Sequence, residues 1–247
     1  MIRAVVFDLD GVLLDSEGLW DAARRDVVAR SGGMWRDEAT EAMLGMSSLE
    51  WSAYLHDVLG VDLAPEQIVE LVVEDLLARY RRELPLVPGA RDAVERIGAR
   101  WPLALATSSN PVVIETVLEV AGLSDAFEAT VSSEEVPRGK PHPDVYLEAT
   151  HRLGRDPADC AAIEDSGNGI RSALAAGLRV VAVPNIHFPP PQEVLARADA
   201  VTGDLSGLTV ELVERVGHPG ADEDLDEAEV ESFPASDPHS DWAGPAR

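Results

Sequence analysis

The stretch that most constrains this chain is residues 2–16, where a short apolar run ends in two aspartates and a glycine. Residues 2–7 are rich in β-branched and aromatic side chains, which predicts a strand buried on both faces. Asp8 and Asp10 follow, and side chains two apart on an extended chain point the same way. Gly11 then permits a sharp turn. Taken alone, the stretch also fits a strand ending in an ordinary polar turn.

A long stretch with helical patterns follows these residues, and after it the chain alternates between helix and strand patterns. Apolar residues recur at helical spacing between residues 16 and 85. Further strands are predicted over 103–106, 129–131, 160–163, 179–183 and 200–201. Helices are predicted between them, including 111–121 and 170–176, and a last helix is predicted over 205–216. This alternation predicts an α/β fold: a Rossmann-like parallel sheet with helices on both faces, and a small all-helical domain inserted after the first strand. The predicted core is 1–15 and 86–216, and the predicted helical insert is 16–85.

The last stretch, residues 217–247, differs from the rest in composition. It holds nine acidic residues, one arginine and four prolines, with few large apolar side chains. Such a segment has too little apolar surface to offset the entropy of ordering, so we predict a disordered acidic tail.

The charge of the whole chain limits its partners. The formal net charge is −25 over 247 residues, which disfavours binding to nucleic acid and to anionic membrane surfaces. The single cysteine, Cys160, follows a polar turn and begins an apolar run, which predicts a core residue and permits no internal disulfide. No apolar run of about 18 residues and no signal-peptide pattern is present. We therefore expect a soluble cytoplasmic protein, and a monomer.

Polar residues that could take part in catalysis or ligand binding follow four of the predicted strands. Because the carboxyl ends of parallel strands share one edge of a sheet, these side chains are expected to converge. They are Asp8 and Asp10, Thr107 and Ser108, Lys140, and Glu164 and Asp165.

Four carboxylates at one edge would repel one another without compensation. A hard cation such as Mg²⁺ suits oxygen ligands and would resolve the repulsion. Lys140 adds a second positive charge, and Thr107 and Ser108 offer hydroxyl and backbone donors. Together these groups predict a site for a phosphoryl group.

The motifs as a set resemble the haloacid dehalogenase superfamily, in the branch of phosphatases similar to β-phosphoglucomutase. The resemblance covers residues 1–216 and includes the order and spacing of the motifs. It also implies that the helical insert, 16–85, is the cap domain that this branch carries after the first motif. The motifs are Asp8-Leu9-Asp10-Gly11-Val12, Ala106-Thr107-Ser108-Ser109, Lys140-Pro141-His142-Pro143-Asp144 and Ile163-Glu164-Asp165-Ser166.

The resemblance implies a role for each residue. Asp8 would attack phosphorus and form an aspartyl phosphate, and Asp10 would protonate the leaving oxygen and then activate water. Thr107, Ser108 and Lys140 would bind the phosphoryl oxygens. Mg²⁺ would be held by the side chain of Asp8, the backbone carbonyl of Asp10, Asp165, and Glu164 directly or through water.

The function expected from this resemblance is that of a Mg²⁺-dependent phosphatase acting on a small phosphorylated metabolite, a sugar or polyol phosphate. A phosphosugar mutase is the main alternative, but Trp20 and Ser48 stand where the mutase carries a histidine and an arginine. A third possibility is a binding protein that keeps the fold without catalysis. Cap residues Gly45, Met46 and Ser47 are the predicted substrate contacts.

Overall fold

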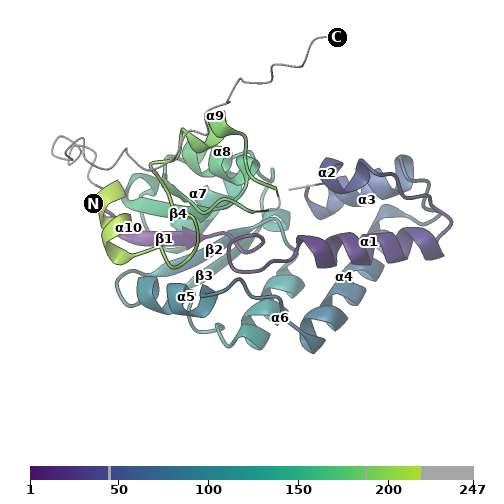
Figure 1. Cartoon of the computed structure of the whole chain (residues 1–247), viewed down its shortest axis with the longest axis horizontal. Helices are drawn as coiled ribbons and strands as arrows, with labels where there is room; N and C mark the ends of the chain where they lie inside the picture. Colours follow the sequence, from purple (N-terminus) through teal and green to yellow (C-terminus); the bar gives the residue numbers. More distant parts are fainter. Residues whose placement is uncertain (44–45, 187, 218–247) are drawn as a thin grey trace, which may run out of the picture.

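A six-stranded, fully parallel sheet with β1 (Ala4–Phe7) near its centre organises the chain (Figure 1). The computed structural model describes residues 1–43, 46–186 and 188–217. The strand order is β3-β2-β1-β4-β5-β6, which confirms the predicted α/β architecture. The other strands are β2 (Leu103–Thr107), β3 (Ala129–Ser132), β4 (Cys160–Glu164), β5 (Arg179–Ala182) and β6 (Ala200–Val201).

Strand β1 is buried on both faces because it pairs with β2 on one side and β4 on the other. Val5 and Phe7 pack into one hydrophobic cluster, whereas Ala4 and Val6 pack into a second cluster across the sheet. This alternation is the period of two expected of a strand, and it explains why the whole run is apolar. Cys160 is buried in the second cluster, as the sequence predicts.

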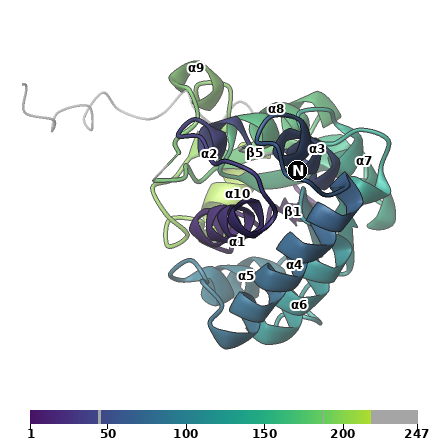
Figure 2. The same ribbon diagram turned by 90° about the vertical axis from the view of Figure 1, so that its right-hand side faces the viewer.

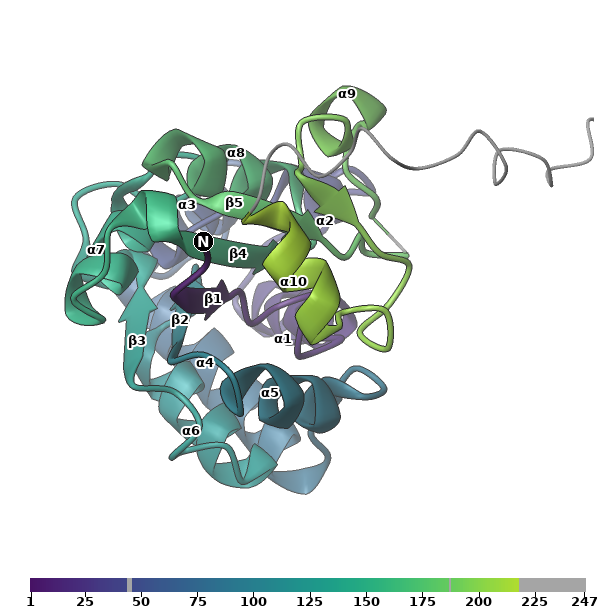
Figure 3. The same ribbon diagram turned by 90° about the vertical axis from the view of Figure 1, so that its left-hand side faces the viewer.

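Helices cover both faces of the sheet (Figure 3). The face of Ala4 and Val6 packs against α7 (Asp144–Arg152) and α8 (Gly167–Ala176), with the short α9 (Gln192–Leu195) beside them. The opposite face packs against three further helices. These are α5 (Ala90–Gly98), α6 (Pro111–Ala121) and α10 (Val210–Val216).

Four helices separate β1 from the rest of the α/β unit and lie together beyond the carboxyl end of β1 (Figures 1 and 2). They are α1 (Glu17–Arg30), α2 (Ala39–Ala42), α3 (Ser48–Asp57) and α4 (Pro65–Arg82). Helix α4 packs against α1, α3 and α6. Its side chains Ile68, Val72, Leu76 and Tyr80 are buried at helical spacing, which gives the helix one apolar face.

The two segments that connect these helices to the sheet lie side by side. The Asp15 amide donates to the Pro85 carbonyl at 2.8 Å, and the Val87 amide donates to the Leu13 carbonyl at 3.0 Å. Both connections therefore leave the α/β unit at one place, beside the turn that follows β1.

Local side-chain hydrogen bonds move two helix boundaries from their predicted positions. The helix predicted from residue 205 begins at Val210, because the Asp204 carboxylate accepts from the Ser206 and Gly207 amides and holds a turn there. Helix α8 instead begins earlier than predicted, at Gly167, where Ser166 caps it by accepting from the Gly169 amide. The predicted tail beyond Gly217 lies outside the described residues.

Within the described part of the chain, every helix is too short or too polar to span a membrane.

Candidate active site

Residues at the carboxyl edge of the sheet converge on one cavity of about 590 Å³. Six of the sequence-predicted site residues line it: Asp8, Asp10, Thr107, Ser108, Lys140 and Asp165. Helices α1 and α2 contribute Glu17 and Glu41, and α8 contributes Asn168 and Arg171. A cavity of this volume is suited to a small metabolite rather than a macromolecule.

Asp8 and Lys140 form the buried centre of this cavity. Lys140 Nζ lies 2.9 Å from Asp8 Oδ1, and both side chains are over nine-tenths buried. Burial raises the pKa of the Asp8 carboxyl to about 7, although the nearby Lys140 opposes this shift. Burial disfavours a charged lysine, but the Asp8 and Glu164 carboxylates outweigh it and raise the pKa of Lys140. Lys140 is therefore a permanently charged group beside the Asp8 carboxylate.

Glu164 anchors that lysine. Its fully buried carboxylate accepts from Lys140 Nζ at 2.6 Å and from the Tyr146 hydroxyl at 2.8 Å. The Asp165 amide and the Ser166 amide and hydroxyl donate to its other oxygen, at 3.0 to 3.1 Å. These five donors more than fill the roughly four lone-pair sites that a carboxylate offers. These contacts hold the Glu164 carboxylate, and through it Lys140, in place. Tyr146 takes part in this network, although its position in the sequence did not predict it.

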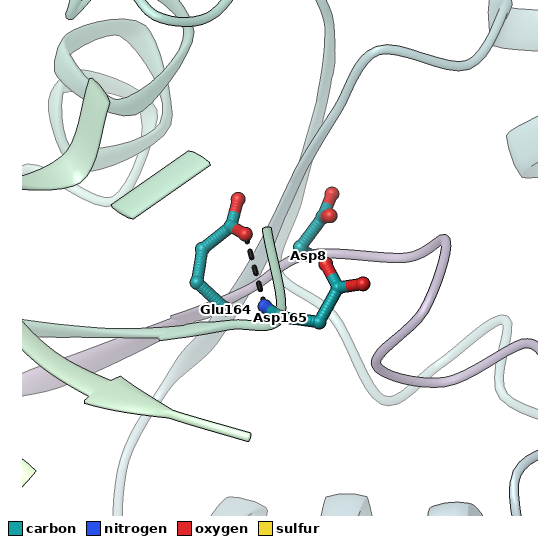
Figure 4. A group of neighbouring side chains, drawn as sticks. All are labelled: Asp8, Glu164 and Asp165. Carbon is teal, nitrogen blue, oxygen red and sulfur yellow. Dashed lines mark hydrogen bonds between the residues drawn. The ribbon is translucent and has the colours of Figure 1, made fainter. Parts of the chain in front are cut away.

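The acidic groups at this edge fit a hard cation. Oxygens of Asp8, Glu164 and Asp165 lie within 4.8 Å of one another. Glu164 and Asp165 leave the end of β4 in opposite directions, so that the Asp165 carboxylate lies on the Asp8 side (Figure 4). Asp165 Oδ1 is buried and accepts no hydrogen bond from the described residues. Burial, with Glu164 and Asp8 nearby, raises the pKa of Asp165. A buried oxygen without a donor beside a second carboxylate is the environment that a divalent cation would stabilise.

Two glycines leave room for these carboxylates. Gly11 has φ +82°, and a Cβ there would fall 1.8 Å from Asp165 Oδ2. In the first turn of α8, a Cβ at Gly169 would fall 1.7 Å from Glu164 Oε1. The turn at Gly11 is the one predicted from the sequence, whereas the need for Gly169 arises only from the packing of α8 on β4.

We expect Gly169→Ala to destabilise the protein by about 1–3 kcal/mol, the usual cost of overpacking, and to lower Tm by roughly 2–10 °C. The Glu164 carboxylate cannot move aside without losing hydrogen bonds from its five donors. Gly167→Ala in the same turn is the matched control, since its Cβ would meet no atom closer than 3.3 Å. Equal melting temperatures for the two variants in a thermal scan would contradict this account.

Asp10 is held by donors from both sides of the cavity. Ser16 Oγ donates to Asp10 Oδ1 at 2.5 Å, and Trp20 Nε1 donates to the same oxygen at 3.3 Å. Ser109 Oγ and Thr107 Oγ1 face Asp10 Oδ2 at 2.6 and 3.4 Å. Asp10 thus joins β2 to the first turn of α1, and Ser109 is a partner that the sequence analysis did not predict.

The predicted substrate contacts of the cap are placed elsewhere. Ser47 caps α3, where its amide donates to the Glu50 carboxylate at 2.8 Å, and it lines a separate pocket beside Asn110. Met46 packs against the hydrophobic core. Neither residue lines the cavity that holds Asp8 and Lys140, and Gly45 lies outside the described residues.

The carboxyl edge of the parallel sheet thus brings together a buried aspartate–lysine pair, a second aspartate and an acidic group that could hold a cation. The chain belongs to the haloacid dehalogenase-like hydrolases, whose family model matches residues 2–177.

Named relatives and a solved structure agree with this assignment. The chain is 36% identical over 221 residues to hexitol phosphatase B of Escherichia coli K12, covering 84% of this chain and 95% of that protein. It is 31% identical over 182 residues to fructose-1-phosphate phosphatase YqaB of the same strain, covering 72% and 95% respectively. The crystal structure of CbbY from Rhodobacter sphaeroides in complex with phosphate matches with a TM-score of 0.78 at 28% identity, covering 87% of this chain and 100% of that one.

Proposed function

We propose that this protein is a Mg²⁺-dependent phosphatase that hydrolyses a small sugar or polyol phosphate through an aspartyl-phosphate intermediate. The observation that carries the proposal is the buried pair of Asp8 and Lys140, with Asp10 lining the same cavity. Relatives named as hexitol and fructose-1-phosphate phosphatases support the substrate class.

In the proposed reaction, a carboxylate oxygen of Asp8 attacks phosphorus, and the bond between phosphorus and the leaving oxygen breaks. Asp10 gives its proton to that oxygen, and the alcohol departs. Asp10 then takes a proton from a water molecule, which attacks the aspartyl phosphate and releases phosphate. Atoms and charge balance, because Asp10 recovers in the second half the proton it lost in the first.

Three residues are proposed to bind the phosphoryl oxygens. Lys140 supplies a fixed positive charge, and Thr107 and Ser108 supply donors at the end of β2. The side chains of Asp8 and Asp165 and the backbone carbonyl of Asp10 would hold Mg²⁺. Glu164, occupied by five donors, is proposed to act mainly by positioning Lys140 and to reach the cation only through water. When bound, the cation would supply positive charge that offsets the charge of the phosphoryl group.

The phosphatase is favoured over a mutase by the two positions where the mutase motif is missing. Ser48, at the position of the mutase arginine, is buried and donates to Asn110 Oδ1 at 3.2 Å. Trp20, at the position of the histidine, is a donor-only side chain whose N–H faces Asp10. Neither side chain offers the acid–base group or the charge that a bisphosphate intermediate would require. A purely binding role would leave the Asp8–Lys140 and Asp10 arrangement without a use.

We further propose that residues 16–85 act as a lid over the cavity. The enzyme is proposed to be cytoplasmic. The paired connections beside Leu13 and Pro85 join this helical unit to the sheet at one place, suited to a hinge, and closure would have to shift the contact of α4 with α6. Closure would exclude water and restrict substrates to small phosphorylated metabolites. Contacts from Gly45, Met46 and Ser47 to substrate stay a prediction for the closed form.

The proposal is tested by phosphate release from a panel of phosphorylated metabolites, with isomerisation of β-glucose 1-phosphate assayed in parallel. Hydrolysis of sugar or polyol phosphates without isomerisation is the expected result. Isomerisation as the main activity would establish the mutase instead. Binding of the panel without turnover of any member, including p-nitrophenyl phosphate, would establish the binding protein.

We expect chelation by EDTA to abolish phosphate release and added Mg²⁺ to restore it. We also expect Mg²⁺ to raise Tm, because a cation that binds only the folded state stabilises it. Asp165→Asn removes one carboxylate from the cation site and is expected to lose most of this Tm shift. An equal Mg²⁺-dependent shift in the variant would contradict the assignment of Asp165 as a ligand.

A further inference from the structure

We propose that Glu17 is a specificity-determining residue that accepts hydrogen bonds from hydroxyl groups of the leaving alcohol. This inference rests on the proposed phosphatase function and adds a structural basis for choosing among phosphomonoesters. It assigns the first residue of α1 to a carboxylate subsite for polyhydroxylated, uncharged leaving groups.

Glu17 lines the same cavity as the proposed acid, Asp10. It shares that cavity with Asp8 and Lys140. The adjacent residue, Ser16, donates to the Asp10 carboxylate at 2.5 Å, and burial together with the Asp10 charge raises the pKa of Glu17. Because Asp10 is the group proposed to protonate the leaving oxygen, a carboxylate near Asp10 in the cavity wall is available to the leaving alcohol.

The Glu17 carboxylate, in the first turn of α1, has no direct side-chain partner within the described part of the chain. Among the described residues, no donor hydrogen-bonds to it and no cation lies within ion-pair distance. Neighbouring acids on the same helix are occupied, since Asp21 accepts from Arg25 at 2.6 Å and from Thr40 at 2.6 Å. The nearby Arg24 guanidinium instead lies over the rings of Trp20 and Trp51, 5.0 and 5.2 Å from their centroids.

A carboxylate in this position carries a cost. Burial, and secondarily the Asp10 carboxylate, raise the pKa of Glu17 to about 7, although Arg24 opposes the shift. A negative group beside a site for a phosphate ester also repels the substrate unless the substrate supplies donors. Hydroxyl groups on the carbon atoms beyond the leaving oxygen are such donors, and they would restore the hydrogen bonds that burial removes.

The same group discriminates between leaving alcohols. A polyol phosphate offers hydroxyls to Glu17, whereas an aryl phosphate offers none. A phosphorylated sugar acid offers hydroxyls but also brings a carboxylate that Glu17 repels. A site that hydrogen-bonds a substrate hydroxyl selects for it, because an analogue without the hydroxyl leaves the half-buried Glu17 carboxylate without that partner.

The test compares kcat/KM for sorbitol 6-phosphate, 6-phosphogluconate and p-nitrophenyl phosphate in the wild type and in Glu17→Ala and Glu17→Gln. We expect Glu17→Ala to lower the ratio of kcat/KM for sorbitol 6-phosphate to that for p-nitrophenyl phosphate by about 10- to 100-fold, since hydrogen bonds to charged groups are worth about 1.5–3 kcal/mol. Glu17→Gln keeps an acceptor and is expected to recover part of this ratio. In both variants, the ratio of kcat/KM for 6-phosphogluconate to that for sorbitol 6-phosphate is expected to be higher than in the wild type.

Glu70→Ala is the matched control, because Glu70 is an exposed glutamate of α4 outside the cavity. It removes one negative charge from the same group of helices and is expected to leave all three ratios unchanged. An unchanged ratio in Glu17→Ala would overturn the inference. A wild type that cleaves p-nitrophenyl phosphate at least as well as any hydroxylated substrate would also overturn it, while leaving the phosphatase function intact. Absence of turnover with every substrate would overturn both.

Discussion

Asp8→Asn is expected to abolish turnover of every phosphomonoester, to below a few per cent of wild-type activity. The carboxamide is a poor nucleophile and cannot form an acyl phosphate, so the first chemical step has no acceptor. The change also removes the negative charge that lies 2.9 Å from Lys140 Nζ. Phosphate release under saturating substrate, measured with p-nitrophenyl phosphate and with a polyol phosphate, checks the result.

Asp125→Asn provides the matched control, because it makes the same chemical change at an exposed position after α6. It is expected to keep full activity. Mass spectrometry of the wild type, quenched during turnover, is expected to show a phosphoryl adduct at Asp8 that Asp8→Asn lacks. Residual activity of Asp8→Asn above a few per cent, in protein of wild-type fold, would rule out the covalent mechanism.

The sheet could be predicted from the sequence because its signals are local. A strand buried on both faces is a continuous apolar run, and each run here is followed by a turn or a capping residue. Helix α6 has its predicted bounds, since Pro111 begins it and Gly122 ends it in a left-handed conformation. The boundary errors at α8 and α10 arise where side chains of Ser166 and Asp204 compete for backbone amides.

The strand-end acids could be predicted for a topological reason, since parallel strands bring their carboxyl ends to one edge. The groups that support them could not be predicted in the same way. Tyr146 and Gly169 contact Glu164 only because α7 and α8 pack on the same face of β4. Nothing in their immediate sequence distinguishes them from an ordinary helix tyrosine and a helix glycine.

Functional residues of the helices within residues 16–85 are harder to predict, because their roles depend on which way each helix faces. Residues 46 and 47 lie in a loop predicted to contact substrate, but Ser47 caps α3 and lines a different pocket. Glu17 belongs to no recognised motif, and it stands out only because its carboxylate, without a partner in the described ranges, lies in the wall of the cavity. Periodicity identifies the apolar face of such a helix and leaves the role of its polar face undetermined.

Asp10→Asn is expected to slow hydrolysis of an alkyl phosphate by about 10²- to 10⁴-fold, the usual effect of losing a general acid–base group. An alkoxide leaves poorly without a proton, and the amide has no acidic proton to give. In the structure, a hydroxyl lies beside each Asp10 oxygen: Ser16 Oγ beside Oδ1, and Ser109 Oγ and Thr107 Oγ1 beside Oδ2. Hydroxyls can turn to accept, so the hydrogen bonds around Asp10 are compatible with the protonated form that delivers a proton to the leaving oxygen.

The dependence on leaving group separates this role from a structural one. A p-nitrophenolate departs without a proton, so Asp10→Asn is expected to slow the first step much less with p-nitrophenyl phosphate than with an alkyl phosphate. Burst measurements of p-nitrophenol release isolate that step, since water activation in the second step is impaired for both substrates. If the two esters lost the same factor in the first step, Asp10 would be maintaining the geometry of the site rather than delivering a proton. Ser109→Ala removes a hydroxyl that bonds Asp10 Oδ2 and keeps the acid, and is expected to produce a smaller, leaving-group-dependent loss.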